Sequence, residues 1–133
     1  MSRPLEGITV VSLEQAIAAP FCTRQLADLG ARVIKIERPG SGDDTRAWGP
    51  PYLKDADGRD TSEAAYFLGA NRNKRSLAVD LATPQGQAIV RKLAGQVDVL
   101  VENFKVGDLA RYGLDAQSLL AEHPGLVICS ITG

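Results

Sequence analysis

A set of polar and aromatic side chains directly follows a short apolar run in the second half of the chain. Val97–Val101 is followed by Glu102, Asn103, Phe104 and Lys105. These four residues offer a hydrogen-bond acceptor, an amide that donates and accepts, a flat stacking surface and a cation. Such a set suits a nucleotide-like ligand. The polar loop that follows any strand would also explain Asn103 and Lys105, and both interpretations stay open.

Arg38 is a second candidate for ligand binding. It lies at the end of a second predicted strand, Arg32–Ile36, and a guanidinium pairs well with a phosphate. A surface ion pair with Glu37 or Asp43 is the alternative. Farther along, three cations lie within Asn71–Arg75, which could meet phosphates or form a solvated charged corner.

Hydrophobic periodicity predicts the elements that position these residues. Strands are expected at 8–13, 32–36, 76–80, 97–101 and 126–133, and helical segments at 20–29, 61–70, 84–96, 107–112 and 115–122. Alternating strands and helices predict an α/β fold with a parallel sheet and flanking helices. Ligands of such sheets bind outside the carboxyl ends of the strands, and Arg111 is placed to face that crevice.

Local signals support several of these boundaries. Pro20 opens the first helix and Gly30 closes it, while Thr83 is a good N-cap in front of Pro84. The first turn lacks the glycine-rich dinucleotide fingerprint, which weakens an NAD-binding interpretation. We expect Glu37–Asp60, which is rich in Gly, Pro and charges, to be a long loop.

Composition excludes several function classes. The 133 residues are 44% hydrophobic and 23% charged, with a net charge of -1, so no overall field attracts nucleic acid or a membrane. No apolar run predicts a membrane span or signal peptide, so we expect a cytoplasmic protein.

Cys22 and Cys129 make no metal motif and are expected to be buried thiols. His123 is explained by its place at a helix end.

The predicted last strand, Leu126–Gly133, has nothing after it to cover it. A parallel sheet normally continues into a crossover helix after such a strand. We therefore expect residues 1–133 to be the amino-terminal part of one domain, incomplete at the carboxyl end and without an internal linker. Such a chain is expected to associate with itself or with a separate remainder.

Five stretches give the chain a resemblance to a known family. They are Pro4-Leu-Glu-Gly-Ile, Ala18-Ala-Pro-Phe-Cys, Leu26-Ala-Asp-Leu-Gly-Ala-Arg-Val-Ile-Lys-Ile-Glu, Asn71-Arg-Asn-Lys-Arg-Ser-Leu-Ala-Val-Asp-Leu and Val101-Glu-Asn-Phe. Together they resemble the amino-terminal region of the class III coenzyme A transferases, which include α-methylacyl-CoA racemases. The resemblance implies a Rossmann-like core, an interlocked homodimer, and coenzyme A (CoA) bound along the strand ends.

The resemblance also implies a set of CoA-binding residues. They are Ala16, Ile17, Ala18, Arg38, Val79, Asp80, Leu81, Ala82, Asn103, Phe104, Lys105 and Arg111. The turn at residues 16–18 would line the CoA and acyl site, and residues 79–82 the adenine. Residues 103–105 would hold the pantetheine and diphosphate, and the two arginines would contact the nucleotide part. Ile17 stands where formyl-CoA transferases have glutamine, which argues against a formyl or oxalyl substrate.

The family's nucleophile is an aspartate that forms an aspartyl-CoA thioester, which is covalent carboxylate catalysis. None of Asp28, Asp43, Asp80, Asp98 and Asp108 matches its motif, so we expect no catalytic residue and no metal ligand within this chain. The expected function is CoA binding in an enzyme that transfers CoA between an acyl-CoA and a carboxylic acid. An acyl-CoA racemase and a CoA-binding module without chemistry are the alternatives.

Overall fold

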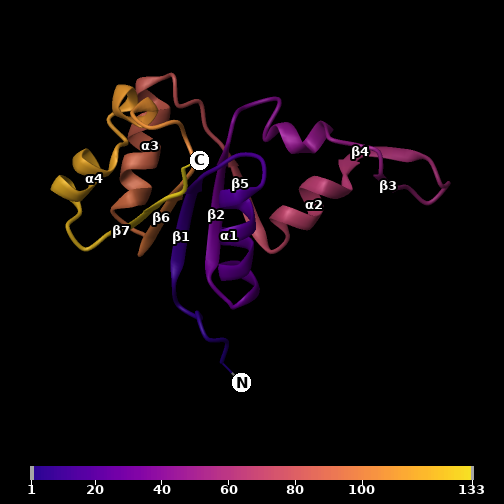
Figure 1. Ribbon diagram of the computed structural model, residues 1–133, viewed down its shortest axis with the longest axis horizontal. Coiled ribbons are helices and arrows are strands. Elements are labelled where there is room, and N and C mark those ends of the chain that lie inside the picture. Colours follow the sequence, from indigo (N-terminus) through magenta and orange to yellow (C-terminus); the bar gives the residue numbers. More distant parts are fainter. Residues whose placement is uncertain (1, 133) are drawn as a thin grey trace.

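A computed structural model describes residues 2–132 and shows a parallel sheet with helices on both faces (Figure 1). The sheet has five strands in the order β5 (Lys74–Ala78), β2 (Arg32–Glu37), β1 (Thr9–Leu13), β6 (Val99–Glu102) and β7 (Val127–Ser130). Every neighbouring pair in it is parallel. The predicted α/β class is therefore confirmed.

Each face of the sheet has its own apolar core, because successive side chains of a strand point to opposite faces. On one face, helix α1 (Ala18–Asp28) covers Val10 of β1 and its neighbours on β2 and β6. On the other face, α3 (Pro84–Ala94), α4 (Ala116–Glu122) and the 3-10 helix η2 (Asp108–Tyr112) cover Val11, Leu13 and Leu100. Burying each such side chain stabilises the fold by about 1.5–3 kcal/mol.

The order of the strands fixes where a ligand crevice can form. From β1 the chain builds β2 and β5 on one side, and then returns to place β6 and β7 on the other side of β1. The direction of winding therefore reverses between β1 and β6. Loops leave such a point in opposite directions and open a crevice at the carboxyl ends of the two strands.

The predicted helix signals are confirmed for the start of α3 and the end of α1. Pro20 does not open α1, however, because the helix begins two residues earlier, at Ala18. The Thr83 hydroxyl accepts a hydrogen bond from the Gly86 amide at 3.1 Å, and Pro84 is the first residue of α3. Gly30 follows the end of α1 with φ of +108°, a left-handed conformation that glycine adopts without steric cost. Asp115 caps α4 by accepting the Ser118 amide.

The segment between β2 and β5 is more regular than predicted. Within the predicted loop lie the 3-10 helix η1 (Asp44–Ala47) and strand β3 (Tyr52–Lys54), and β4 (Asp60–Ala64) pairs antiparallel with β3. The predicted helix 61–70 is therefore wrong at its start, since α2 spans Ala65–Asn71. The reason is the Asp55 carboxylate, which accepts the amides of Asp57 and Arg59 and closes a hairpin turn. Figure 1 shows this hairpin extending away from the sheet.

Other boundaries and burial predictions also need correction. β5 begins two residues before the predicted position, and β7 ends at Ser130, while Gly133 lies outside the described residues. The prediction of buried thiols is wrong, because Cys22 is half-buried and Cys129 is exposed on an edge strand. Within residues 2–132, no helix is long and apolar enough to cross a membrane, and no cluster of three potential metal ligands occurs.

Candidate functional site

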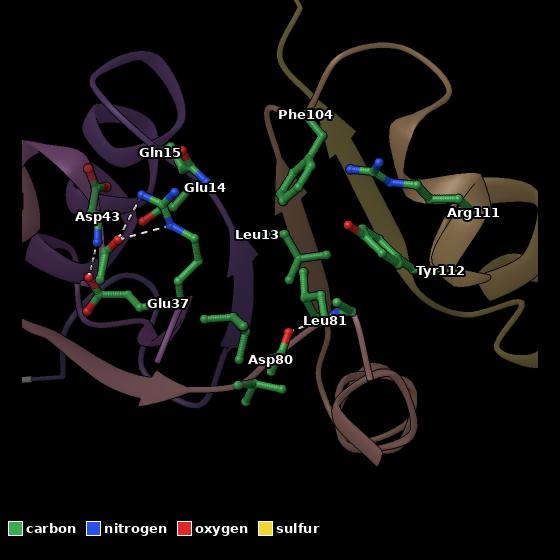
Figure 2. A pocket seen from close by; sticks show the side chains of 15 residues that line it. Leu13, Glu14, Gln15, Glu37, Asp43, Asp80, Leu81, Phe104, Arg111 and Tyr112 are labelled. Atoms are coloured by element: carbon green, nitrogen blue, oxygen red, sulfur yellow. Dashed lines mark hydrogen bonds between the residues drawn. The ribbon is translucent and has the colours of Figure 1, made fainter. Parts of the chain in front are cut away.

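A cavity of about 320 Å³ lies at the carboxyl ends of β1, β2, β5 and β6, where the winding of the sheet reverses (Figure 2). Its walls are Leu13, Glu14, Gln15, Ile36, Glu37, Arg38, Gly42, Asp43, Val79, Asp80, Leu81, Ala82, Phe104, Arg111 and Tyr112. We call this cavity the crevice. In Figure 2, Glu14, Gln15 and Asp43 lie on one side of it and Phe104, Arg111 and Tyr112 on the other, with Leu13 between them.

A second cavity of about 260 Å³ adjoins the crevice. It is lined by Gln15, Asn103, Phe104, Lys105, Asp108 and Arg111. Gln15, Phe104 and Arg111 line both cavities. A long ligand could therefore lie in both and pass between these three side chains.

The structure brings most of the predicted site residues together. Arg38, Val79–Ala82, Phe104 and Arg111 line the crevice, and Asn103 and Lys105 line the second cavity. Arg38 and residues 103–105 were predicted because they follow strands that end at this edge of the sheet. Arg111 was predicted from a helix that faces the crevice, and Val79–Ala82 from the family resemblance alone. Gln15 and Tyr112 were missed, although Gln15 also follows a predicted strand.

The turn Ala16–Ala18 lies beside the crevice and lines neither of these two cavities. Ala16 has φ of +63°, an uncommon value for a residue with a side chain, and Ile17 is half-exposed. The preceding residue, Gln15, is held by the side chain of Asn103, which accepts its amide at 2.9 Å and donates to its carbonyl at 2.8 Å. The Asn103 amide therefore fixes the turn instead of pointing free into the crevice.

Two polar side chains have partners that the sequence did not predict. The Glu102 carboxylate is buried and accepts the backbone amide of Phe104 at 2.8 Å, so it offers no acceptor to the crevice. Arg38 does form an ion pair, but with Asp44 instead of Glu37 or Asp43. Its guanidinium also donates to the Gly42 carbonyl at 3.2 Å, and its side chain is half-exposed.

Beneath the crevice lies a buried ionic cluster that sequence reasoning did not find, made of Glu14, Lys35, Asp43 and Lys74. Lys35 Nζ lies 2.7 Å from an Asp43 oxygen and 3.6 Å from a Glu14 oxygen, and Lys74 Nζ lies 2.8 Å from the same Glu14 oxygen. The four side chains are at most 2% exposed. Two anions and two cations therefore balance in a site with almost no exposed surface, where unpaired charges would be very costly.

The predicted basic patch 71–75 is divided between this cluster and the surface. Lys74 is buried in the cluster, whereas Arg72 pairs with Asp28 at the surface at 2.7 Å. Asn71 is also buried, and its side-chain oxygen accepts both Lys35 and Lys74. The prediction of a solvated corner is therefore wrong for Asn71 and Lys74, and their side chains do not face a phosphate at the surface.

A second buried acid, Glu37, is held by Arg46, whose guanidinium donates to its two oxygens at 2.9 and 2.7 Å. Ser76 and the Asp43 amide donate to the same carboxylate. Burial by itself raises the pKa of Glu37, but these hydrogen bonds outweigh burial and lower the pKa from 4.5 to about 2. Glu37 is therefore ionised at neutral pH while being only 6% exposed.

The low pKa of Glu37 predicts a pH dependence of stability. Because the folded state lowers this pKa, the stabilisation is complete above pH 4.5 and is lost as the pH falls toward 2. A shift of this size corresponds to about 3 kcal/mol of folding free energy.

We expect Glu37→Gln to be less stable than the wild type at pH 7, with a difference in unfolding free energy that shrinks between pH 5 and 2. Urea unfolding at successive pH values measures this difference, and the exposed Glu63→Gln is the control. A difference that stays constant over this range would contradict the assignment.

The remaining acids near the site have structural roles. Asp80 accepts the Ala82 amide at 2.9 Å and so shapes the loop after β5. Asp98 accepts the Thr9 amide at 2.8 Å and joins β6 to β1. Asp43, besides pairing with Lys35, accepts the amide and hydroxyl of Thr45. Each of these carboxylates therefore accepts hydrogen bonds that hold the local backbone in place.

Comparison with known proteins gives a consistent result. The model of CoA-transferase family III matches residues 5–133. The chain is 54% identical over 130 residues to succinate–glutarate CoA-transferase of Agrobacterium fabrum, covering 98% of this chain and 32% of that protein. It is 46% identical over 131 residues to human succinyl-CoA:glutarate CoA-transferase, covering 98% of this chain and 28% of the human protein. A crystal structure of a CAIB/BAIF family protein from Brucella suis superposes with a TM-score of 0.90 at 49% identity, covering 100% of this chain and 34% of that one. The chain thus spans about a third of the length of its relatives.

Proposed function

We infer that the crevice binds CoA, because this chain belongs to CoA-transferase family III and its crevice holds guanidinium and aromatic groups suited to such a ligand. The observation that carries the proposal is that Arg38, Phe104 and Arg111 line the same cavity, at the point where the winding of the sheet reverses. Guanidinium groups bind phosphates through paired hydrogen bonds, and an aromatic ring packs against a pantetheine arm or a base.

The layout of the two cavities supports a place for each part of CoA. Val79–Ala82 form a largely apolar wall in the crevice, suited to the flat adenine ring. Arg38 and Arg111 lie within reach of the phosphates. The pantetheine arm would pass Phe104 into the second cavity, beside Lys105 and Asn103. In this arrangement the turn Ala16–Ala18 would lie against the acyl end of the ligand.

We propose that the intact protein transfers CoA between dicarboxylic acids, with succinyl-CoA as donor and a dicarboxylate such as glutarate as acceptor. The relatives named above support this substrate class by their names. In this reaction the thioester bond of succinyl-CoA breaks and a thioester bond forms to the acceptor. One oxygen of the acceptor carboxylate is transferred to the succinyl group, which leaves as succinate. We propose an aspartyl-CoA intermediate on a nucleophile that is not among the aspartates of this chain. A cytoplasmic homodimer, with this chain as part of a longer domain, belongs to the same proposal.

The test is an exchange assay on the intact protein. With succinyl-CoA and glutarate, we expect glutaryl-CoA and succinate to form in equal amounts, detected by liquid chromatography with mass spectrometry. Formate in place of glutarate is the matched control and should give little exchange. Absence of exchange with every dicarboxylate, although CoA binds, would reject the transferase and leave a CoA-binding module. Absence of CoA binding would reject the crevice assignment itself.

A further inference from the structure

The crevice is lined by more acids than bases, which is unexpected for a site that takes a phosphorylated ligand. Glu14, Glu37, Asp43 and Asp80 line it, against the two arginines already described. A carboxylate near a phosphate disfavours binding, since like charges repel and the effect is strong where water is excluded. For an anionic ligand to bind, nearby positive charge must balance the negative charge of these carboxylates.

The offset comes from cations beneath the crevice that do not line it. Lys35 lies 2.7 Å from Asp43, Lys74 lies 2.8 Å from Glu14, and Arg46 lies 2.7 Å from Glu37. Neither lysine is among the residues that line the crevice. Because Lys35 and Lys74 are buried, salt in solution screens them little.

Hydrogen bonds fix both lysines in place. The Asn71 side-chain oxygen accepts Lys35 at 2.9 Å and Lys74 at 3.0 Å, and its nitrogen donates to the Phe67 carbonyl at 3.0 Å. The Thr23 hydroxyl donates to the second oxygen of Glu14 at 2.7 Å. These hydrogen bonds hold both ammonium groups under the crevice.

We propose that Lys35 and Lys74 determine the affinity of the crevice for anionic ligands without touching them, by neutralising Asp43 and Glu14 from below. The proposal rests on the proposed CoA site and adds two positioning residues to it. Losing Lys74 leaves one net negative charge in the buried ionic cluster, directly under the ligand. At an effective dielectric constant of about 20, such a charge weakens the binding of an anion about 10 Å away on the order of tenfold.

The environment of Lys74 supports this role. Glu14, Lys35 and Asp43 act on its charge from the loop after β1, from β2 and from the loop after β2, and the Cys22 thiol faces it from α1. Burial lowers the pKa of Lys74 from 10.5 to about 8, although Glu14 and Asp43 partly oppose this effect. Above pH 8 the ammonium loses its proton and the cluster becomes negative, so affinity for an anionic ligand falls as the pH rises through 8.

The test compares CoA with pantetheine, which has the same arm but no phosphates. In the intact protein, calorimetry at pH 7 should show that Lys74→Met binds CoA on the order of tenfold more weakly than the wild type, while pantetheine affinity is unchanged. Lys54→Met, which removes the same charge from the exposed hairpin, is the matched control and should leave both affinities unchanged. Replacing Glu14 as well, in Glu14→Gln/Lys74→Met, restores the charge balance and should recover most of the lost affinity for CoA.

If Lys74→Met lowers the affinities for CoA and pantetheine equally, Lys74 has a merely structural role and the proposal is overturned. An unchanged affinity for CoA would also overturn it. If Lys74→Met does not fold, the wild type decides the question: the ratio of CoA to pantetheine affinity should fall between pH 7.5 and 9. The thiol, which both ligands carry, cancels from this ratio. A constant ratio would overturn the proposal. A wild type that binds pantetheine but not CoA, or neither ligand, would instead reject the proposed function.

Discussion

Replacing Asp43 by alanine is expected to lower the free energy of unfolding by about 3–5 kcal/mol. The reason is that Lys35 would keep a buried positive charge with its nearest carboxylate removed. The same substitution removes the acceptor of the Thr45 amide and hydroxyl, at 2.9 and 2.8 Å. Burial raises the pKa of Asp43, but the bonds from Lys35 and Thr45 outweigh burial and lower it, so the carboxylate is charged at neutral pH.

Urea unfolding of the intact protein at pH 7 measures this effect, and the neighbouring residue supplies the control. Asp44→Ala removes the same group from an exposed ion pair with Arg38 and should cost less than about 1 kcal/mol. The double variant Lys35→Met/Asp43→Leu removes both charges and should be more stable than Asp43→Ala, because an apolar pair leaves no charge unpaired. A loss from Asp43→Ala no larger than that from Asp44→Ala would mean that water reaches the cluster.

The main elements and the crevice could be predicted because their signals are local. Thr83-Pro84 marks a helix start within two residues, and Arg32–Ile36, with three β-branched residues, is typical of a strand. Once parallel strands are predicted, the rule that ligands lie at their carboxyl ends places Arg38 and Phe104 in one crevice. No distance between them was needed for that step.

The buried ionic cluster could not be predicted in this way, because its partners meet only in the folded chain. Glu14 and Lys74 are 60 residues apart, and nothing near either of them in the sequence identifies its partner. One signal was available in Lys35, which interrupts a strand predicted to be buried. A lysine in such a place is almost never fully buried unless it is paired, so an acid partner could have been expected, though not named.

The hairpin was missed for a related reason. Its strands are short and mostly exposed, so neither shows the alternation of apolar and polar residues that predicts a strand. The turn signal Asp55-Ala-Asp-Gly58 is present in the sequence, but the same residue types are also typical of a long loop. Pairing across this turn, and not local preference, makes Asp60–Ala64 a strand instead of the first turn of a helix.

Arg111→Ala is expected to weaken CoA binding by roughly ten- to a hundredfold, because a charge-assisted hydrogen bond to phosphate contributes about 1.5–3 kcal/mol. Arg111 lines both cavities, and its guanidinium lies 4.7 Å from the centre of the Tyr112 ring. Within residues 2–132, no carboxylate lies within 4.0 Å of it. It can therefore pair with a phosphate without first breaking an ion pair.

Arg38→Ala should cost less than Arg111→Ala, and this order tests the geometry more closely than either loss alone. Arg38 is paired with Asp44 in the described structure and must exchange that partner for a phosphate, so its net contribution is smaller. Calorimetric titration of CoA into the intact protein gives both dissociation constants. Arg59→Ala, on the exposed hairpin, controls for the loss of one positive charge. Unchanged constants for both crevice variants would remove the crevice as the CoA site, whereas a larger loss from Arg38→Ala would place the phosphates nearer to the loop after β2 than to η2.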